Sequence, residues 1–183
     1  MSRLVIRPED DSSAVLVDVV DGAAIAEGLK PIGVSFERWR ADTPLADDAD
    51  DQAVLTAYAV EIERLKAMGG YQSMDVVRMA PDNPAAPALR AKFLSEHTHA
   101  DDEVRFFVEG EGQFYLHKDG RVFAVLCEAG DLISVPAGTP HWFDAGEKPR
   151  FAAIRLFVSP DGWVANYTGS AIAERFPKFE TVG

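Results

Sequence analysis

The stretch His97-Thr98-His99-Ala100-Asp101-Asp102-Glu103 places two histidines and an acidic side chain at odd-numbered positions. On an extended strand, residues of like parity share a face, so His97, His99 and Glu103 are expected to point the same way. Two imidazoles and a carboxylate suit a divalent ion such as iron, nickel, manganese, copper or zinc. A His-x-His pair alone is weak support, because such pairs also occur on protein surfaces. A further ligand from another segment is needed.

That ligand stands at the end of a second stretch, residues 130–141, where His141 follows the turn Pro136-Ala137-Gly138. Together the two stretches resemble the cupin superfamily. Its first motif, G-x5-H-x-H-x3–4-E-x6-G, is met by His97, His99, Glu103 and Gly110, with Ala91 in place of the leading glycine. Its second, G-x5-P-x-G-x2-H-x3-N, is met by Gly130, Pro136, Gly138 and His141, with Ala145 in place of the final asparagine. The resemblance implies a double-stranded β-helix that holds one metal ion through His97, His99, Glu103 and His141.

The patterning outside these stretches agrees with that fold class. Short apolar or alternating segments separated by turn residues predict strands at 4–6, 14–20, 33–39, 74–79, 104–109, 113–117, 122–127, 132–135, 141–144 and 151–158. Turns are expected at 110–112, 118–120, 128–130 and 136–140, and helical spacing predicts helices over 22–29 and 54–68. We therefore expect a mainly β chain with a few helices (α+β). The architecture would be a jelly-roll cupin barrel, one domain over 1–183 with its metal-site core at about 70–168, and the N-terminal strands and helices would pack outside.

The charge and cysteine content of the chain restrict the kinds of molecule that it can bind and the bonds that it can form. The 183 residues include 18 basic and 30 acidic side chains, a net charge of −12, which opposes binding to nucleic acid and to anionic membranes. The single cysteine, Cys127, excludes an intrachain disulfide, and no apolar run approaches the roughly 20 residues of a membrane helix. The acidic run over 42–51 is interpreted as a loop entering a helix rather than as a cation site. We expect a cytoplasmic monomer.

Several residues should surround the metal. Arg105 continues the odd-numbered face of the ligand strand and could either pair with an acidic neighbour or clamp an anionic substrate. Arg155 interrupts an otherwise apolar strand, and Phe143 shares the parity of His141. Trp163 follows soon afterwards. His117, beside the expected Asp119-Gly120 hairpin, is interpreted as a surface residue at a strand end.

A narrower resemblance covers about residues 70–168. The segment from Phe93 to Phe106 is similar to the acireductone dioxygenase signature F-x-x-E-H-x-H-x-x-D-E-x-R-[FY], and residues 136–143 and 155–158 with Trp163 also resemble that family. The resemblance implies a metal-dependent dioxygenase of methionine salvage with one Fe²⁺ or Ni²⁺ per chain. Its substrates would be O₂ and the acireductone 1,2-dihydroxy-3-keto-5-methylthiopentene. The iron form would yield formate and 4-methylthio-2-oxobutanoate, and the nickel form 3-methylthiopropanoate, formate and carbon monoxide.

The same resemblance suggests roles for the surrounding residues. Arg105, and in second place Arg155, would stabilise the enediolate, while Phe93, Phe143 and Trp163 would shape the pocket. Glu96 or Asp102 could accept the substrate proton, although strand parity turns both away from the metal. Two alternatives stay open. One is another metal cupin enzyme, such as a sugar-phosphate isomerase or a different dioxygenase, and the other is a non-enzymatic binding module. The acidic composition disfavours the phosphate enzyme, and the lack of a basic stretch disfavours a DNA-linked sensor.

Overall fold

Strand β6 (Glu103–Lys118) is the longest element of the computed structural model, which describes residues 1–46 and 49–180, and it belongs to two walls of a barrel. Its first half pairs with β8 (Asp131–Val135) and β10 (Phe151–Phe157). Its second half pairs with β7 (Arg121–Glu128) and β9 (His141–Asp144). All of these pairings are antiparallel, so β6 links the two walls and carries Glu103 at its start.

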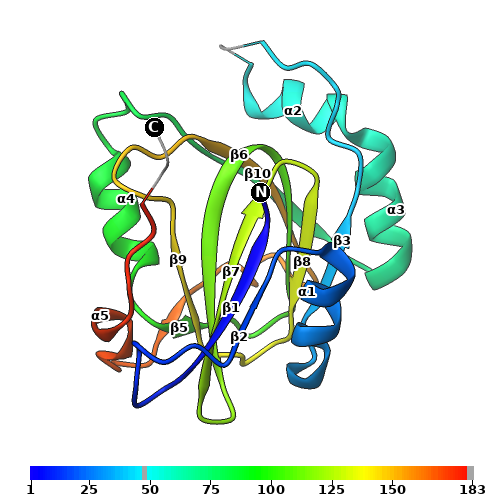
Figure 1. Ribbon diagram of the computed structural model, residues 1–183. Helices are drawn as coiled ribbons and strands as arrows, with labels where there is room; N and C mark the ends of the chain where they lie inside the picture. The colour runs from blue at the N-terminus through cyan, green and yellow to red at the C-terminus, as the bar shows by residue number, and fades with distance from the viewer. Residues whose placement is uncertain (47–48, 181–183) are drawn as a thin grey trace.

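The remaining strands extend each wall. One wall has the order β3-β8-β6-β10-β4, where β3 is Ser35–Arg38 and β4 is Ser73–Met79. The other has the order β11-β5-β9-β6-β7-β1-β2, with β11 at Asn166–Tyr167, β5 at His97–Thr98, β1 at Arg3–Pro8 and β2 at Val17–Val19. The expected mainly β cupin architecture is confirmed (Figure 1). The N-terminal strands β1 to β4, expected outside the barrel, instead extend its two walls.

The helices lie on the outer surfaces. They are α1 (Gly22–Leu29), the 3₁₀ turn η1 (Lys30–Ile32), α2 (Asp51–Ala57), α3 (Ala59–Gly69), α4 (Ala86–Phe93) and α5 (Ile172–Arg175). Figure 1 shows α2 and α3 on one side of the barrel and α4 and α5 on the other. Helix α2 begins where the Asp50 side chain accepts a hydrogen bond from the backbone N–H of Ala53, at 2.8 Å. The end of the acidic run is therefore a helix cap as expected, while Asp47 and Asp48 lie outside the described residues.

Aromatic side chains fill the space between the walls. The rings of Phe107, Phe114, Phe143 and Phe151 are at most 1% exposed, and their neighbouring centroids lie 5.0–6.4 Å apart. Burying one such side chain stabilises the fold by about 1.5–3 kcal/mol. This packing gives the side chains around the metal centre a rigid support.

The single helix expected over residues 54–68 is wrong. The structure has two helices, α2 and α3, with a break at Tyr58, whose backbone angles of φ −111° and ψ 26° are not helical. The Tyr58 ring is 1% exposed and packs edge-on against Phe106, with 5.7 Å between centroids. Met68, expected on the packing face, is 61% exposed. After the break at Tyr58, helix α3 buries Ile62 and Leu65, but its last turn leaves Met68 exposed to solvent.

The turn expected at Gly110-Glu111-Gly112 is also wrong. Strand β6 continues through these residues and bends, with Gly110 at φ +65° and a register shift opposite Ala152 and Ala153. A bulge of this kind re-aims a strand without ending it. By contrast, the hairpin at Asp119-Gly120 is confirmed, with both residues at positive φ between β6 and β7.

The bend leads to a stability prediction for Gly110→Ala. A Cβ atom at Gly110 would overlap the backbone carbonyl oxygen of Arg150, and the positive φ adds strain. We expect the free energy of unfolding, measured by urea denaturation, to fall by about 3 kcal/mol or more. Gly120→Ala is the matched control, because Gly120 has a similar φ of +71° but no atom within 4 Å of its Cβ position. That variant should lose about 1 kcal/mol. Equal losses in the two variants would contradict the importance of the close approach at the bend.

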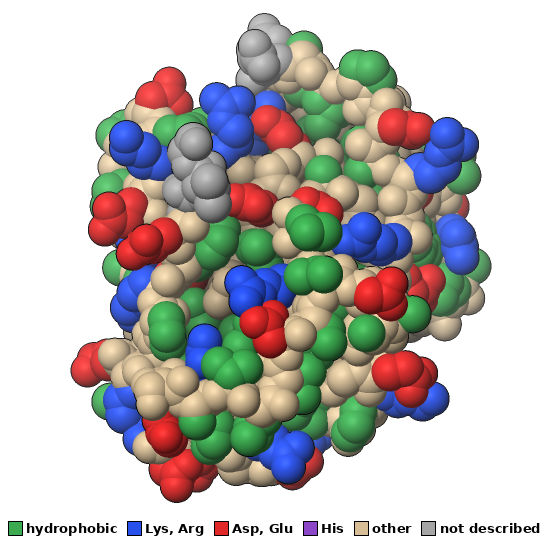
Figure 2. Space-filling model, in the orientation of Figure 1, with side chains coloured by type: hydrophobic (Ala, Val, Ile, Leu, Met, Phe, Trp, Pro, Cys, Tyr) green, Lys and Arg blue, Asp and Glu red, His purple; other side chains and the backbone are tan. Residues whose placement is uncertain are grey.

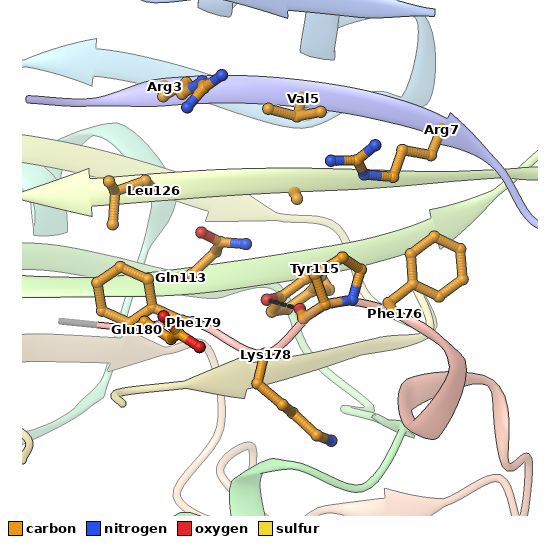
Figure 3. Close-up of a pocket in the computed structure, with 12 residues that line it drawn as sticks. Arg3, Val5, Arg7, Gln113, Tyr115, Leu126, Phe176, Lys178, Phe179 and Glu180 are labelled. Atoms are coloured by element: carbon orange, nitrogen blue, oxygen red, sulfur yellow. Dashed lines mark hydrogen bonds between the residues drawn. The ribbon is translucent and has the colours of Figure 1, made fainter. Parts of the chain in front are cut away.

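The C-terminal segment closes over the outer face of the second wall. The Tyr115 hydroxyl donates to the carbonyl oxygen of Pro177 at 2.6 Å, as Figure 3 shows. Between this segment and strands β1, β6 and β7 lies a groove of about 320 Å³, lined by Arg3, Arg7 and Phe176 among others. None of the four histidines lines this groove.

The surface carries both signs of charge. In Figure 2 acidic and basic side chains are interspersed, and no histidine is visible on this face. No helix in the described part of the chain combines the length and apolar character needed to cross a membrane.

Candidate metal centre

Three histidines from two separated segments meet inside the barrel. His97 lies on β5, directly opposite His141 at the start of β9, and His99 follows β5. One ring nitrogen from each lies within 4.8 Å of those of the other two, and all three side chains are buried. The structure thus brings together the histidines of both sequence motifs.

Backbone carbonyls fix the orientation of each ring. The Nδ1 atoms of His97, His99 and His141 lie 2.8, 3.0 and 2.9 Å from the carbonyl oxygens of Ser95, Val164 and Thr139, respectively. A carbonyl oxygen only accepts, so each Nδ1 carries a hydrogen, and Nε2 is the ring atom that each histidine can offer to a metal. Burial, together with the neighbouring His141, lowers the pKa of His97 to about 4, which keeps that ring neutral at neutral pH. Neutral imidazoles with free Nε2 atoms are suited to bind a metal.

Glu103 adds a carboxylate to the histidines. It is 1% exposed, and its Oε2 atom lies 3.3 Å from Nε2 of His99 and 3.3 Å from Nε2 of His141. Its Oε1 atom accepts from Nη2 of Arg105 at 2.6 Å. Burial alone would raise the pKa of Glu103, but the charge of Arg105 and the contacts with His141 and His99 together outweigh it, and that pKa is held well below its usual range. The carboxylate is therefore ionised.

These donors fit a divalent metal ion. Glu103 Oε2 is buried without a hydrogen-bond partner and faces the Nε2 atoms of His99 and His141 at 3.3 Å. Lone pairs converging in a buried space repel one another unless a cation lies between them. Metal–ligand bonds of about 2.1 Å place neighbouring ligand atoms about 3.0–3.4 Å apart, which agrees with the two 3.3 Å separations. His97, His99, Glu103 and His141 could together hold one ion.

Arg105 lies beside the carboxylate and retains free donors. It is 3% exposed, and its guanidinium carbon lies 4.6 Å from the ring centroids of both Phe114 and Phe143. Its Nε and Nη1 atoms are buried without a hydrogen-bond partner. The salt bridge is therefore confirmed. The role of Arg105 as a clamp for an anion stays a prediction, for which its unpaired N–H groups are available.

Arg155 is engaged differently. It lies opposite Arg105 in the pairing of β10 with β6, but its Nε and Nη2 atoms donate to the two carboxylate oxygens of Asp75, at 2.9 and 2.6 Å. This bidentate pair uses the N–H groups of Nε and Nη2 that would otherwise be available to bind a ligand. Arg155 contributes positive charge near the site while Asp75 holds it in place.

The aromatic residues expected around the pocket differ in how deeply they are buried. Phe143 is 1% exposed and packs on Arg105, and Phe93 at the end of α4 contacts it edge-on, with 6.3 Å between centroids. Trp163 is 53% exposed, on the segment whose next residue, Val164, accepts the His99 hydrogen bond. Phe93 and Phe143 thus form one packed unit, and Trp163 lies at the surface.

The two candidate proton acceptors have structural contacts. Both carboxylate oxygens of Glu96 are hydrogen-bonded, to His117 at 2.7 Å and to Thr168 at 2.6 Å. Asp102 accepts from the backbone N–H of Ala137 through Oδ1 at 2.8 Å. A role for either as a base stays a prediction.

The interpretation of His117 as a surface residue is wrong, since its side chain is only 23% exposed and contacts two carboxylates.

Sequence reasoning missed three aromatic neighbours of the site. Phe114 packs on Arg105, Phe157 lies 5.7 Å from the His99 ring, and Tyr167 lies 5.9 Å from the His97 ring. Phe157 shares the odd parity of Arg155 on β10, which was an available signal. Nothing local indicated Tyr167, because β11 is only two residues long.

Comparisons with known proteins agree with this centre. The chain matches the ARD/ARD′ family over residues 4–165. It is 60% identical to the acireductone dioxygenase of Parvibaculum lavamentivorans, covering 99% of this chain and 98% of the relative. Its identity to the acireductone dioxygenase of Aquifex aeolicus is 55%, over 100% and 98% of the two chains. Among solved structures it resembles an acireductone dioxygenase from Bacillus anthracis with a cadmium ion in its active centre, with a TM-score of 0.77 and 33% identity over 91% of this chain and 98% of that one.

Proposed function

This chain belongs to the ARD/ARD′ family, and we propose that it is an acireductone dioxygenase that oxidises 1,2-dihydroxy-3-keto-5-methylthiopentene with O₂. The observation that carries the proposal is the position of Arg105. Two of its buried N–H-bearing nitrogens are unpaired, and its third contacts the carboxylate that faces the histidines. A metal-chelating, oxygen-rich anion is the ligand that uses both features.

His97, His99, Glu103 and His141 would hold one divalent ion, Fe²⁺ or Ni²⁺. When bound, this ion would supply Lewis acidity and a template that orients the substrate. All four donors come from one chain, so the site needs no second copy, and we propose that the protein acts as a monomer. We also propose that residues 1–183 form one domain.

The chain's own residues prepare the substrate for reaction. Arg105 would bind the oxygens of the enediolate through Nε and Nη1, and its guanidinium carbon lies 4.6 Å from the ring centroids of both Phe114 and Phe143. Phe93 and Phe143 would contact the methylthio tail, and the exposed ring of Trp163 would cover it. Of the two candidate bases we favour Asp102, because both oxygens of Glu96 are already bonded.

The products would depend on the metal. With iron we propose formate and 4-methylthio-2-oxobutanoate, and with nickel 3-methylthiopropanoate, formate and carbon monoxide. Each outcome consumes one O₂ per substrate, and the atoms of substrate and O₂ are all accounted for in the products.

The chain would have no nucleic-acid or membrane partner and would act in the cytoplasm.

The test is a reconstitution experiment. Apoprotein prepared with a chelator is loaded with Fe²⁺ or Ni²⁺, mixed with the acireductone without oxygen, and then exposed to O₂. We expect O₂ uptake and formate from both forms, with carbon monoxide only from the nickel form. An isomerase or a binding module would consume no O₂, so a metal-loaded protein without substrate-dependent O₂ uptake would refute the proposal.

A further inference from the structure

Glu96 is a buried carboxylate immediately before the first metal-site histidine. It is 4% exposed, and three hydrogen bonds fix it. His117 Nδ1 lies 2.7 Å from Oε2, the Thr168 hydroxyl donates to Oε1 at 2.6 Å, and the Thr168 backbone N–H donates to the Glu96 carbonyl oxygen at 3.1 Å. A buried charge is tolerated only when it is paired and hydrogen-bonded in this way. The side chain therefore ties three segments of the chain together.

His117 supplies the positive charge that Glu96 requires. Its second ring nitrogen, Nε2, lies 2.8 Å from the carboxylate of Glu9, so both nitrogens face acceptors and both carry a hydrogen. Burial alone would lower the pKa of His117, but the bonds to Glu9 and Glu96 outweigh it and raise that pKa. Glu9 is 47% exposed, whereas Glu96 is buried, so the inner contact is the one protected from solvent.

Two of these three segments contact His97 directly. The residue before Glu96, Ser95, provides the carbonyl that accepts from His97 Nδ1 at 2.8 Å. Tyr167, the residue before Thr168, pairs with His97 across β11 and β5. Movement of Glu96 would therefore shift both the Ser95 carbonyl and β11, and with them the His97 ring.

We infer that His117 and Thr168 are positioning residues that hold Glu96 and, through it, orient His97 toward the metal. The inference rests on the proposed metal site but assigns residues outside it. Groups that orient a metal ligand typically contribute about 10–100-fold to metal affinity. His117 and Thr168 do not contact the metal ligand themselves. They contribute to metal affinity by holding Glu96, whose neighbours in the chain are Ser95 and His97.

The test uses Co²⁺ binding to the full-length apoprotein, followed by titration and by the visible spectrum of the bound ion, which reports coordination geometry. His117→Ala should weaken Co²⁺ binding by about 10-fold or more and change the spectrum. Thr168→Val, which replaces the hydroxyl with a methyl group of similar size, should change both measurements in the same direction. His117→Asn should restore part of the affinity, because its amide can still donate to Glu96.

Glu9→Ala is the matched control, since it removes the outer partner of His117 and leaves the inner one. We expect its Co²⁺ affinity to stay within about 3-fold of the original. If His117→Ala and Thr168→Val both bind Co²⁺ with unchanged affinity and spectrum, the inference is overturned while the metal site stands. Equal weakening in Glu9→Ala would overturn it as well, because the effect would then not pass through Glu96. An unmutated protein that binds no Co²⁺ would refute the metal site itself.

Discussion

Replacing His141 by alanine should give a folded protein that retains no stoichiometric metal and has no measurable turnover. His141 is 2% exposed, and its Nε2 atom is one of the four donors that converge in the barrel. Changing a group that merely supports a ligand costs about 10–100-fold in affinity, so loss of a ligand should cost more than about 100-fold. Metal content of the purified variant and its rate of O₂ uptake with the acireductone measure the two effects.

The folded state of this variant provides the control. In the metal-free protein His141 makes no metal bond, and its removal leaves a small cavity beside Glu103, whose carboxylate keeps its contact with Arg105. We expect the free energy of unfolding of apo His141→Ala to stay within about 2 kcal/mol of the unmutated apoprotein. Full metal content or full turnover in a folded His141→Ala protein would refute the assigned site.

The four proposed ligands could be predicted from sequence, but the reason given for three of them was incomplete. Parity along one strand placed His97, His99 and Glu103 on a common face. In the structure β5 spans only His97–Thr98, a bend follows, and Glu103 starts a new strand. His97 meets His141 because β5 pairs with β9, and Glu103 starts β6 opposite Val135 of β8, in the other wall. The spacing of the motifs was enough to identify the four ligands. The strand pairing that brings them together depends on contacts between distant segments, which no local pattern shows.

Tertiary packing explains the elements that sequence reasoning misplaced. Gly110-Glu111-Gly112 has the composition of a turn, yet strand partners on both sides carry β6 through it. The helical periodicity around Tyr58 is real, but burial of that ring against Phe106 breaks the helix in two. In both places a favourable long-range contact outweighs a local preference, and the sequence does not show the partner.

The same limit applies to the charged residues. Arg105 and Arg155 look equivalent in sequence, and what separates them is Asp75, 80 residues before Arg155. His117 looked like a surface residue because its partners Glu9 and Glu96 lie 108 and 21 residues away. Local patterns identify which side chains can do chemistry, and the fold decides which of them have free donors.

Arg105→Lys should lower kcat/KM for the acireductone by about 100-fold or more while the protein keeps its metal. Lysine preserves the positive charge beside Glu103, so the carboxylate stays paired and the ligand set stays intact. It cannot present the planar fork of N–H groups that Nε and Nη1 of Arg105 leave unpaired, and it lacks the planar group that packs against Phe114 and Phe143. Loss of one preorganised donor to a developing oxyanion typically costs about 10²–10³ in rate.

Arg155→Lys is the matched control for this prediction, because the two arginines face each other across paired strands and differ mainly in their partners. The donors of Arg155 toward Asp75 are already used, so its replacement should lower kcat/KM by less than about 10-fold. Steady-state O₂ uptake with metal content measured in parallel separates loss of substrate binding from loss of the ion. If Arg105→Lys retained both its metal and its original kcat/KM, the free N–H groups of Arg105 would have no part in the reaction. If the two variants lost activity equally, the unpaired N–H groups of Arg105 would not explain its loss, because both substitutions keep the positive charge and the donors of Arg155 are already bonded to Asp75.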